Sequence, residues 1–495
     1  MNFISTRGGE CVRGAQAIAQ GIACDGGLFV PEVFPSVSAR EMEDMLSMSY
    51  AERAATVIRK FLDEYDFEEL KAACEKAYAQ FEGGDAAPLV KIDAGLYMLE
   101  LFHGPTCAFK DLALTVLPYL LRKGCDLCGI KEDVLILTAT SGDTGKAALE
   151  GFKDAPGIKI MVFYPSEGVS KMQKLQMATQ EGKNVNVLGV RGNFDTCQSA
   201  VKTIFTSDSC KEELRKKGYI LSSANSINVG RLIPQIAYYF SAYLDLVSSE
   251  QIEMGEKVNF AVPTGNFGNI LAAYYAMKMG LPVGRLVCAS NKNNVLTDFI
   301  RTGVYDRRRE FYKTMSPSMD ILISSNLERL LFELSGREPT RVRVRMEKLA
   351  AEGHYELYEE ERLAVQQLFY ADFCGEDETV ETIYEFFEEY QYPMDTHTAC
   401  AMYAAGNYIA EHEKDKAPMV VVSTANPYKF PQDVMYAVTG NDIKDSFKAI
   451  KHLNLATAMK VPASLSKLRD KPIRFKDTAD KDKLYAEVLK FVDKK

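Results

Sequence analysis

The chain has 495 residues, a net charge of −9 and a pI near 5.4, and 47% of its residues are hydrophobic. This length predicts roughly two to four domains, which can bury their cores without disulfides or structural metals. An acidic chain without a basic field argues against nucleic acid or an anionic membrane as a partner.

The cysteines and the first residues indicate a reducing compartment. The eleven cysteines are scattered, and the opening MNFISTRGGE lacks the apolar core of a secretory signal. We therefore expect free thiols in a cytoplasmic protein. Cys125 and Cys128 form an isolated CxxC that ordinary thiols explain better than zinc, and no histidines have metal-ligand spacing, so no metal is expected. No apolar run approaches the length of a membrane span.

The first part of the chain is predicted to be mainly helical. Residues 1–90 show helical apolar spacing around a short strand-like segment at 27–31. After a Gly-rich break, strands are expected at residues 89–92 and 95–101.

The second of these strands leads into LFHGPTCAFKDLAL, which has Lys110 near its centre. The apolar run at residues 112–121 predicts one helix directly after it. A lone lysine at such a place usually faces solvent, but a rigid strand is also a suitable support for an aimed nucleophile. The rest of the chain therefore has to decide between these two interpretations.

Strands and helices alternate from residue 134 onward, as is typical of a doubly wound α/β unit with right-handed crossovers. The expected strands lie at residues 134–138, 158–165, 185–190, 258–262, 286–290 and 419–423. Residues 328–390 are charge-dense and mostly acidic, and they predict a helical insertion. Its charges, including Arg341, Arg343 and Arg345, are expected to be solvated.

Three loops share one design, an apolar strand followed by a turn rich in Gly, Ser, Thr or Asn and then a helix. They are SGDTG at 141–145, NSINVGR at 225–231 and TGNFGN at 264–269. Backbone N–H groups at a helix start are unsatisfied and bind anions, although capping alone would explain any one loop. Three such loops together with Lys110 indicate an aldehyde cofactor that carries a phosphate. Neither a P-loop nor a dinucleotide fingerprint occurs in the sequence.

The order of these motifs resembles the threonine synthases of fungi and many bacteria. The similar stretches are FHGPTCAFKD, TATSGDTGKAA, SSANSINVGR, VPTGNFGN and STANPYKF, and the resemblance runs from about residue 3 to about residue 445. It implies the tryptophan-synthase β-subunit-like fold of pyridoxal phosphate (PLP) enzymes, fold type II. That fold has two doubly wound α/β domains with PLP in the cleft between them.

Together, the order of the expected strands and helices and the family resemblance divide the chain into four predicted parts. They are a mainly helical N-terminal region at 1–90, a larger PLP-binding α/β domain at 91–125 and 215–450 that holds the helical insertion, a smaller α/β domain at 126–214, and a C-terminal tail and helix at 451–495. We expect the smaller domain to close over the cleft when substrate binds.

The resemblance also implies roles for single residues. Lys110 would be the catalytic residue and hold PLP covalently, and Thr424 would bind the ring nitrogen. The cofactor phosphate would be bound by Gly265, Asn266, Phe267, Gly268 and Asn269, with Asp143 also facing the cofactor. The substrate phosphate would be bound by Ser141, Thr144, Asn225, Ser226 and Arg231. Cys107 and Asn426 depart from residues that are usual in the family.

The activity implied is the conversion of O-phospho-L-homoserine and water into L-threonine and phosphate. A related PLP phospho-lyase that releases 2-oxobutyrate stays open, because the motifs do not report how the intermediate is protonated. A non-catalytic PLP-fold binding protein, or a phosphosugar- or nucleotide-binding protein without PLP, is also conceivable, but the intact Lys110 argues against a binding module. We expect a monomer or homodimer.

Overall fold

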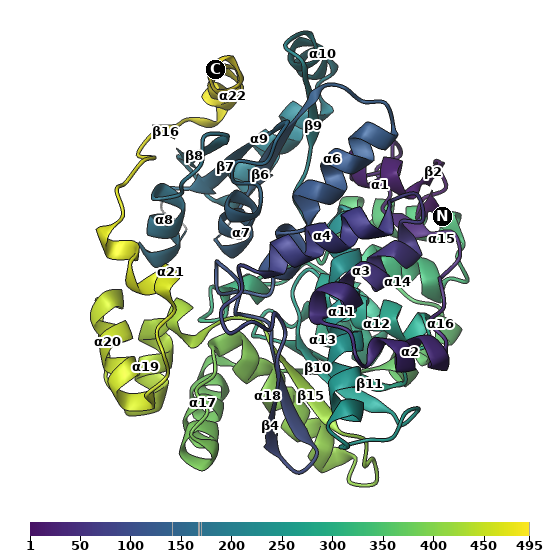
Figure 1. The fold of residues 1–495 in the computed structure, drawn as a ribbon, viewed down its shortest axis with the longest axis vertical. Coiled ribbons are helices and arrows are strands. Elements are labelled where there is room, and N and C mark those ends of the chain that lie inside the picture. The colour runs from purple at the N-terminus through teal and green to yellow at the C-terminus, as the bar shows by residue number, and fades with distance from the viewer. Residues whose placement is uncertain (141, 167–168, 170, 495) are drawn as a thin grey trace.

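The computed structural model describes residues 1–140, 142–166, 169 and 171–494, which fold around two β-sheets (Figure 1). The larger sheet has six strands in the order β14 (Phe369–Phe373), β11 (Val283–Ser290), β10 (Val258–Pro263), β15 (Met419–Ser423), β5 (Leu96–Glu100) and β4 (Leu89–Asp93). All neighbours in it are parallel except β4 and β5.

The smaller sheet has five parallel strands and lies in the upper half of Figure 1. Its order is β16 (Thr478–Ala479), β8 (Val185–Val190), β7 (Ile158–Pro165), β6 (Asp133–Ala139) and β9 (Tyr219–Ser222). The two sheets confirm the predicted α/β class. Since β10 and β15 are buried along their whole length, they consist of nearly continuous apolar residues, as parallel strands covered on both faces do.

Further helices cover the faces and edges of both sheets. They are α7 (Asp143–Gly151), α8 (Lys171–Ala178), α9 (Phe194–Thr206), α10 (Asp208–Lys216), α11 (Val229–Ser248), α12 (Gly268–Lys278), α13 (Val295–Thr302), α18 (Thr396–Glu411), α19 (Pro431–Thr439), α20 (Ser446–Thr457) and α21 (Ala463–Ser466). Within the described residues, none of the helices combines the length and the apolar character that a membrane span requires.

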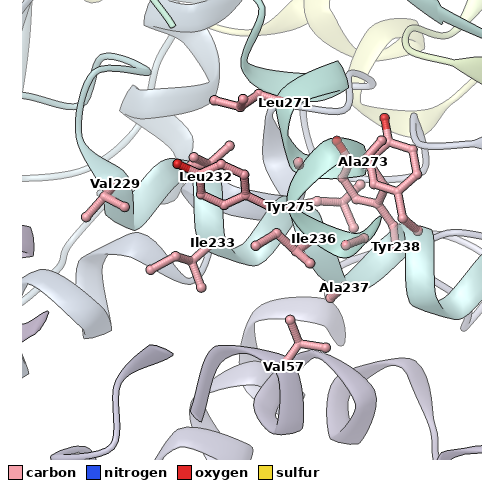
Figure 2. Close-up of a cluster of buried hydrophobic side chains, with 14 of the residues drawn as sticks. Val57, Val229, Leu232, Ile233, Ile236, Ala237, Tyr238, Leu271, Ala273 and Tyr275 are labelled. Carbon is pink, nitrogen blue, oxygen red and sulfur yellow. The ribbon is translucent and has the colours of Figure 1, made fainter. Parts of the chain in front are cut away.

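The main core lies where α11, α12 and α3 (Tyr50–Phe61) meet (Figure 2). Ile233 and Ile236 of α11, Leu271 of α12 and Val57 of α3 are all fully buried there. Burying one such side chain stabilises the fold by roughly 1.5–3 kcal/mol. This packing fixes the first turns of α11 and α12, which begin at two of the three loops singled out in the sequence.

Residues 1–90 are mainly helical, as predicted. They form α1 (Gly14–Gln20), α2 (Ala39–Met45), α3 and α4 (Phe67–Tyr78), and the expected strand near residues 27–31 is β3 (Phe29–Pro31). The strand β1 (Asn2–Ser5) pairs with β2 (Cys11–Arg13) on one side and with β3 on the other. The three strands make a small antiparallel sheet that was not predicted. Ser38 and Ser49 start α2 and α3 with capping boxes.

The prediction of a helical insertion at residues 328–390 is wrong in one respect. Besides α14 (Leu327–Leu334), α15 (Pro339–Ala351), α16 (Glu359–Leu368) and α17 (Glu376–Tyr390), this stretch contains β13 (His354–Glu356), which pairs with β12 (Val304–Asp306), and β14. Because β14 is parallel to β11, the stretch supplies an edge strand of the larger sheet. The strand FYADF tolerates Asp372 because Arg301 forms an ion pair with it at 2.7 Å.

Not every charge in this stretch is solvated either. The side chain of Arg345 is 6% exposed and that of Glu361 is fully buried, and the two form an ion pair between α15 and α16. The expectation therefore fails for Arg345, because the two helices bury it against its own counter-charge.

The run at residues 112–121 forms two short helices rather than one. The first, α5 (Asp111–Leu114), ends before α6 (Leu117–Leu127). Pro118 lies in the first turn of α6 and has no N–H group, so it cannot donate to the carbonyl of Leu114. Between the two helices, the Thr115 hydroxyl donates a hydrogen bond to the Asp111 carbonyl at 2.7 Å.

The residues that build the smaller sheet extend beyond the predicted range 126–214. They include β9 and, from the predicted tail, β16 beside β8. The helix α22 (Leu484–Asp493) also packs on this sheet, with Leu484, Val488, Phe491 and Val492 buried against the apolar side chains of β6 and β7. These residues therefore join the smaller sheet instead of forming a separate tail.

Candidate functional site

Lys110 lies where two neighbouring strands of the larger sheet end. The chain leaves β5 at Glu100 and brings Lys110 to the start of α5, while the neighbouring strand β15 leads to Thr424. The Phe109 N–H donates to the Thr424 carbonyl at 2.9 Å, and Ala108 pairs with Ala425 in an isolated bridge. Ligands of open α/β sheets bind beyond the carboxyl ends of the strands, which is where this segment sits.

The environment of Lys110 favours a neutral amine. The pKa of Lys110 is lowered to about 8, chiefly by burial; Asp143 and Asp111 oppose this shift, whereas Lys429 and Arg231 contribute to it. The Lys110 Nζ atom also lies 4.8 Å from the centre of the Phe109 ring. An amine with a pKa near neutrality is a nucleophile and a proton carrier under ordinary conditions.

Asp111 anchors the turn that precedes Lys110. Its buried carboxylate accepts hydrogen bonds from the Thr106 N–H at 2.8 Å and from the Thr106 hydroxyl at 2.6 Å. Burial raises the pKa of Asp111 to about 6, and the bonds from Thr106 oppose the shift. A Cβ atom at Gly104 would lie 2.5 Å from the Cβ atom of Asp111, so only glycine fits this turn.

The two departures from the family pattern meet at the same contact. The Asn426 N–H donates to the Cys107 carbonyl at 3.0 Å, and the Asn426 side chain accepts from the Tyr428 N–H at 3.0 Å. Cys107 is buried and has a φ of 59°, in the left-handed region. Both residues therefore support the seam between the Lys110 and Thr424 segments.

Asp143 and Lys429 form a buried ion pair beside Lys110. The Lys429 Nζ atom lies 3.1 Å from the Asp143 Oδ1 atom, and the side chains are 2% and 3% exposed. Burial alone would raise the pKa of Asp143, but Lys429 and Lys110 hold it well below its ordinary value. Asp143 is among the predicted site residues, whereas Lys429 is not, although Lys429 stands in the motif STANPYKF.

The loop before α12 has the features of a phosphate cradle. Phe267 has a φ of 63° and α12 starts at Gly268, so the loop ends on the N–H groups of a helix start. A Cβ atom at Gly265 would lie 2.7 Å from the Ser318 carbonyl oxygen. The Asn269 Oδ1 atom accepts from two tyrosine hydroxyls, whereas its buried Nδ2 atom has no partner. An unpartnered buried donor at a helix start fits an anion.

The rim of this loop is held from outside. The Ser324 hydroxyl donates to the Gly265 carbonyl at 2.8 Å, and the Asn326 amide donates to the Asn266 carbonyl at 3.0 Å. These bonds fix the backbone of the loop without using the N–H groups at the start of α12.

Arg231 is a buried cation in the first turn of α11. It is 4% exposed and donates to the Ala224 carbonyl at 3.1 Å, while its buried Nε atom has no hydrogen-bond partner. Burial lowers the pKa of Arg231 to about 10. Among the described residues, no carboxylate forms an ion pair with Arg231. A buried guanidinium with an unused donor fits a second anion.

The other predicted residues lie on the same loops. Thr144 follows Asp143 in the first turn of α7 and is partly exposed, as are Asn225 and Ser226 before α11. Ser141 lies outside the described residues. Thr424 is 5% exposed, and its backbone carbonyl accepts from the Lys110 segment.

A buried Asp–His pair bonds Ser318, whose carbonyl lies against Gly265, and was not predicted. The His397 Nδ1 atom lies 2.6 Å from the Asp395 carboxylate, and the Ser318 N–H donates to the His397 Nε2 atom at 3.1 Å. The Thr398 hydroxyl lies 3.1 Å from that of Ser423, next to Thr424. Asp395 also caps α18, and this capping pattern was the one local signal for the pair.

A buried lysine amine, a loop with the features of a phosphate cradle and a buried arginine, at the ends of two α/β sheets, are what the class of PLP-dependent enzymes requires. The family model "Pyridoxal-phosphate dependent enzyme" matches residues 84–367. The models "Threonine synthase N terminus" and "Threonine synthase, C-terminal" match residues 2–78 and 398–492. The chain belongs to the threonine synthase family.

Individual relatives agree with this membership. The chain is 38% identical to threonine synthase of Pseudomonas aeruginosa over 89% of this chain and 91% of that one. It is 40% identical to Threonine synthase-like 1 of Homo sapiens over 87% of this chain, but spans only 59% of that relative's length. The solved structure of PLP-bound threonine synthase from Brucella melitensis matches with a TM-score of 0.88 and 35% identity, and the match covers 100% of both chains.

Proposed function

We propose that this protein converts O-phospho-L-homoserine and water into L-threonine and phosphate with PLP as its cofactor. The observation that carries the proposal is the buried Arg231, whose Nε atom has no hydrogen-bond partner among the described residues. It would form a second anion site, separate from the cradle before α12. The reaction needs two such sites, because both cofactor and substrate carry a phosphate. Membership of the threonine synthase family supports the same reaction.

The residues present fit the cofactor. Lys110 would hold it covalently, residues 265–269 would bind its phosphate, and the Thr424 hydroxyl would bind its ring nitrogen. Bound there, PLP would supply an electron sink for negative charge that develops next to the substrate amine. A neutral hydroxyl at the ring nitrogen withdraws less charge than a carboxylate-held proton would, so proton removal depends more on placed bases such as Lys110.

The substrate phosphate would be bound by Arg231, with Asn225, Ser226 and Thr144 as further donors and Ser141 beside them in sequence. Charge grows on this phosphate as it leaves, and preorganised donors stabilise that charge more than they stabilise the substrate. The Lys110 amine can take a proton from the substrate carbons and return it, since its pKa of about 8 lies close to neutrality.

The product separates this proposal from its alternatives. Purified protein with PLP and O-phospho-L-homoserine should release threonine and inorganic phosphate in equal amounts, and Lys110→Ala should release neither. Release of 2-oxobutyrate and ammonia without threonine would replace the proposal by the phospho-lyase. Visible cofactor absorbance without any product would favour the binding protein, and no absorbance would favour a protein without PLP.

We further propose that the protein works in the cytoplasm as a monomer or homodimer. All eleven cysteines are free thiols, which supports a reducing compartment. Light scattering of the purified chain would give its mass, and a tetramer would contradict this proposal. Movement of the smaller sheet and its helices over the site on substrate binding is a further proposal. Identical scattering curves with and without a substrate analogue would contradict it.

A further inference from the structure

Lys429 is a buried charge without a role in either proposed binding set. It ends the 3-10 helix η2 (Pro427–Lys429), in the segment that also carries Thr424. Its Nζ atom lies 3.1 Å from the Asp143 Oδ1 atom and donates to the Thr106 carbonyl at 2.8 Å. A lysine is almost never buried without such partners, so these two contacts decide where its ammonium group lies.

These contacts connect parts of the chain that belong to different sheets. Asp143 opens α7, directly after β6 of the smaller sheet, whereas Lys429 follows β15 of the larger sheet. Thr106 belongs to the turn before Lys110 and holds the Asp111 carboxylate. One ammonium group therefore touches the helix that covers the site and the turn that presents its lysine.

We infer that Lys429 is a positioning residue, which holds the Asp143 carboxylate at the face of the site and fixes its place relative to Lys110. The inference rests on the proposed function only in taking Lys110 as the reacting amine. Asp143 also accepts a hydrogen bond from Gln173 at 3.3 Å, but this neutral partner cannot balance a buried negative charge as Lys429 does.

The arrangement gives Lys110 neighbours of both signs. Burial lowers the pKa of its amine, Asp143 raises it, Lys429 and Arg231 lower it, and Asp111 raises it. Removing the charge of Lys429 takes away a repulsion on Lys110 and leaves Asp143 without its ion-pair partner, so that Asp143 acts on Lys110 unopposed. The pKa of Lys110 should then rise. Removing the charge of Asp143 should lower that pKa, and removing both charges should nearly restore it.

The experiment measures the Lys110 amine in the full chain without cofactor, by competitive acetylation followed by mass spectrometry across a pH series. For Lys429→Gln we expect the pKa of Lys110 to rise by about one unit, and for Asp143→Asn to fall by about one unit. The double variant should lie close to the parent. Gln at 429 keeps a donor for the Thr106 carbonyl, and a cooperative thermal melt identifies folded variants.

Lys146→Met is the matched control. Lys146 lies on α7, has a side chain that is 12% exposed and forms an ion pair with Glu150 at 2.8 Å, so its loss disturbs the helix without changing the pair beside Lys110. It should leave the pKa of Lys110 in place. If Lys429→Gln does not fold, two other measurements still test the inference. Asp143→Asn should lower the pKa of Lys110, and Lys429→Arg, which keeps the charge, should leave that pKa at the parent value.

Shifts of the same sign in the two single variants, or none in either, would overturn the inference. A purely structural role for Lys429 would lower the melting temperature without opposite shifts. Because acetylation needs neither PLP nor substrate, a protein that makes no threonine yet shows these shifts refutes the proposed function and leaves the role of Lys429 intact.

Discussion

The Phe109 N–H donates to the Thr424 carbonyl at 2.9 Å, so the segment that presents Lys110 is bonded to the segment expected to hold the cofactor ring. The parallel strands β5 and β15 bring the two segments to the same edge of the sheet. A backbone hydrogen bond does not depend on the side chain at either position. The distance between amine and ring partner is therefore set by the fold, and the side chains around them can tune the chemistry.

Replacing Arg231 by methionine should stabilise the protein and weaken its use of phosphate substrates. A buried guanidinium with an unused donor destabilises the free protein, and its removal should raise the free energy of unfolding by about 1–3 kcal/mol. The same change should lower kcat/KM for O-phospho-L-homoserine by about 10²–10³-fold. With PLP bound, inorganic phosphate should raise the melting temperature of the parent and not that of Arg231→Met.

Arg329 is the matched control for this experiment. It is fully buried like Arg231, but it donates to the carbonyls of Phe29 at 2.9 Å and Ile227 at 2.6 Å. Arg329→Met leaves these carbonyls unpaired, so it should lower the melting temperature. Stabilisation by both substitutions, or by neither, would contradict the interpretation of Arg231 as an anion-binding residue.

The capture of PLP should depend on pH through Lys110. Only the neutral amine attacks an aldehyde, and burial places the pKa of this amine at about 8. The rate should rise roughly tenfold per pH unit below that value and level off above it. Stopped-flow absorbance after mixing the cofactor-free chain with PLP gives this profile, and a midpoint near the ordinary lysine pKa would contradict the environment described.

Alanine at position 104 should disturb Lys110 without touching it. The added Cβ atom would lie 2.5 Å from the Cβ atom of Asp111, whose carboxylate anchors the turn. We expect Gly104→Ala to lower the free energy of unfolding by about 1–3 kcal/mol and to slow PLP capture. Gly406→Ala is the control, because its Cβ atom would meet nothing within 4 Å and helix α18 should gain about 0.5–1 kcal/mol. Denaturant titration would compare the two.

Loss of the buried ion pair between α15 and α16 should destabilise the protein far more than loss of a neighbouring exposed pair. Glu361→Gln leaves Arg345 buried without its counter-charge, which should lower the free energy of unfolding by about 3–5 kcal/mol. The neighbouring Glu359 is 80% exposed and lies 3.9 Å from Arg362, so Glu359→Gln should change it by only about 0–1 kcal/mol. Equal effects in urea unfolding would show that the inner pair is as solvated as the outer one.

Strands buried on both faces could be predicted closely, because they consist of continuous apolar residues. Residues 158–165, 185–190 and 419–423 form β7, β8 and β15 with the predicted bounds. The strand β14 could not be recognised, since FYADF is short and the partners of Asp372, Arg301 and Asn407, are remote in the sequence. Its place in the larger sheet is a property of the folded chain.

The same distinction holds within the site. Lys110, Arg231 and the loop at 264–269 were marked by their own neighbours in sequence, through turns and helix starts. Lys429 was not, because its partner Asp143 is remote in the chain. His397 was marked only by the helix cap at Asp395, since its other partner, Ser318, is remote as well. Until the two ends of such a contact are folded together, a lysine and a histidine in these positions resemble ordinary surface residues.

The smaller sheet can be completed only after β16 and α22, which lie near the C-terminal end of the chain, have been translated. They cover one edge and one face of the smaller sheet, yet a ribosome makes them long after β6, β7 and β8. The growing chain therefore carries an open strand edge at β8, and the apolar cluster that contains Leu137 and Phe163 lacks the cover that α22 supplies, while most of the larger sheet is translated. During that interval, a chaperone has a hydrophobic surface to bind that the finished protein no longer displays.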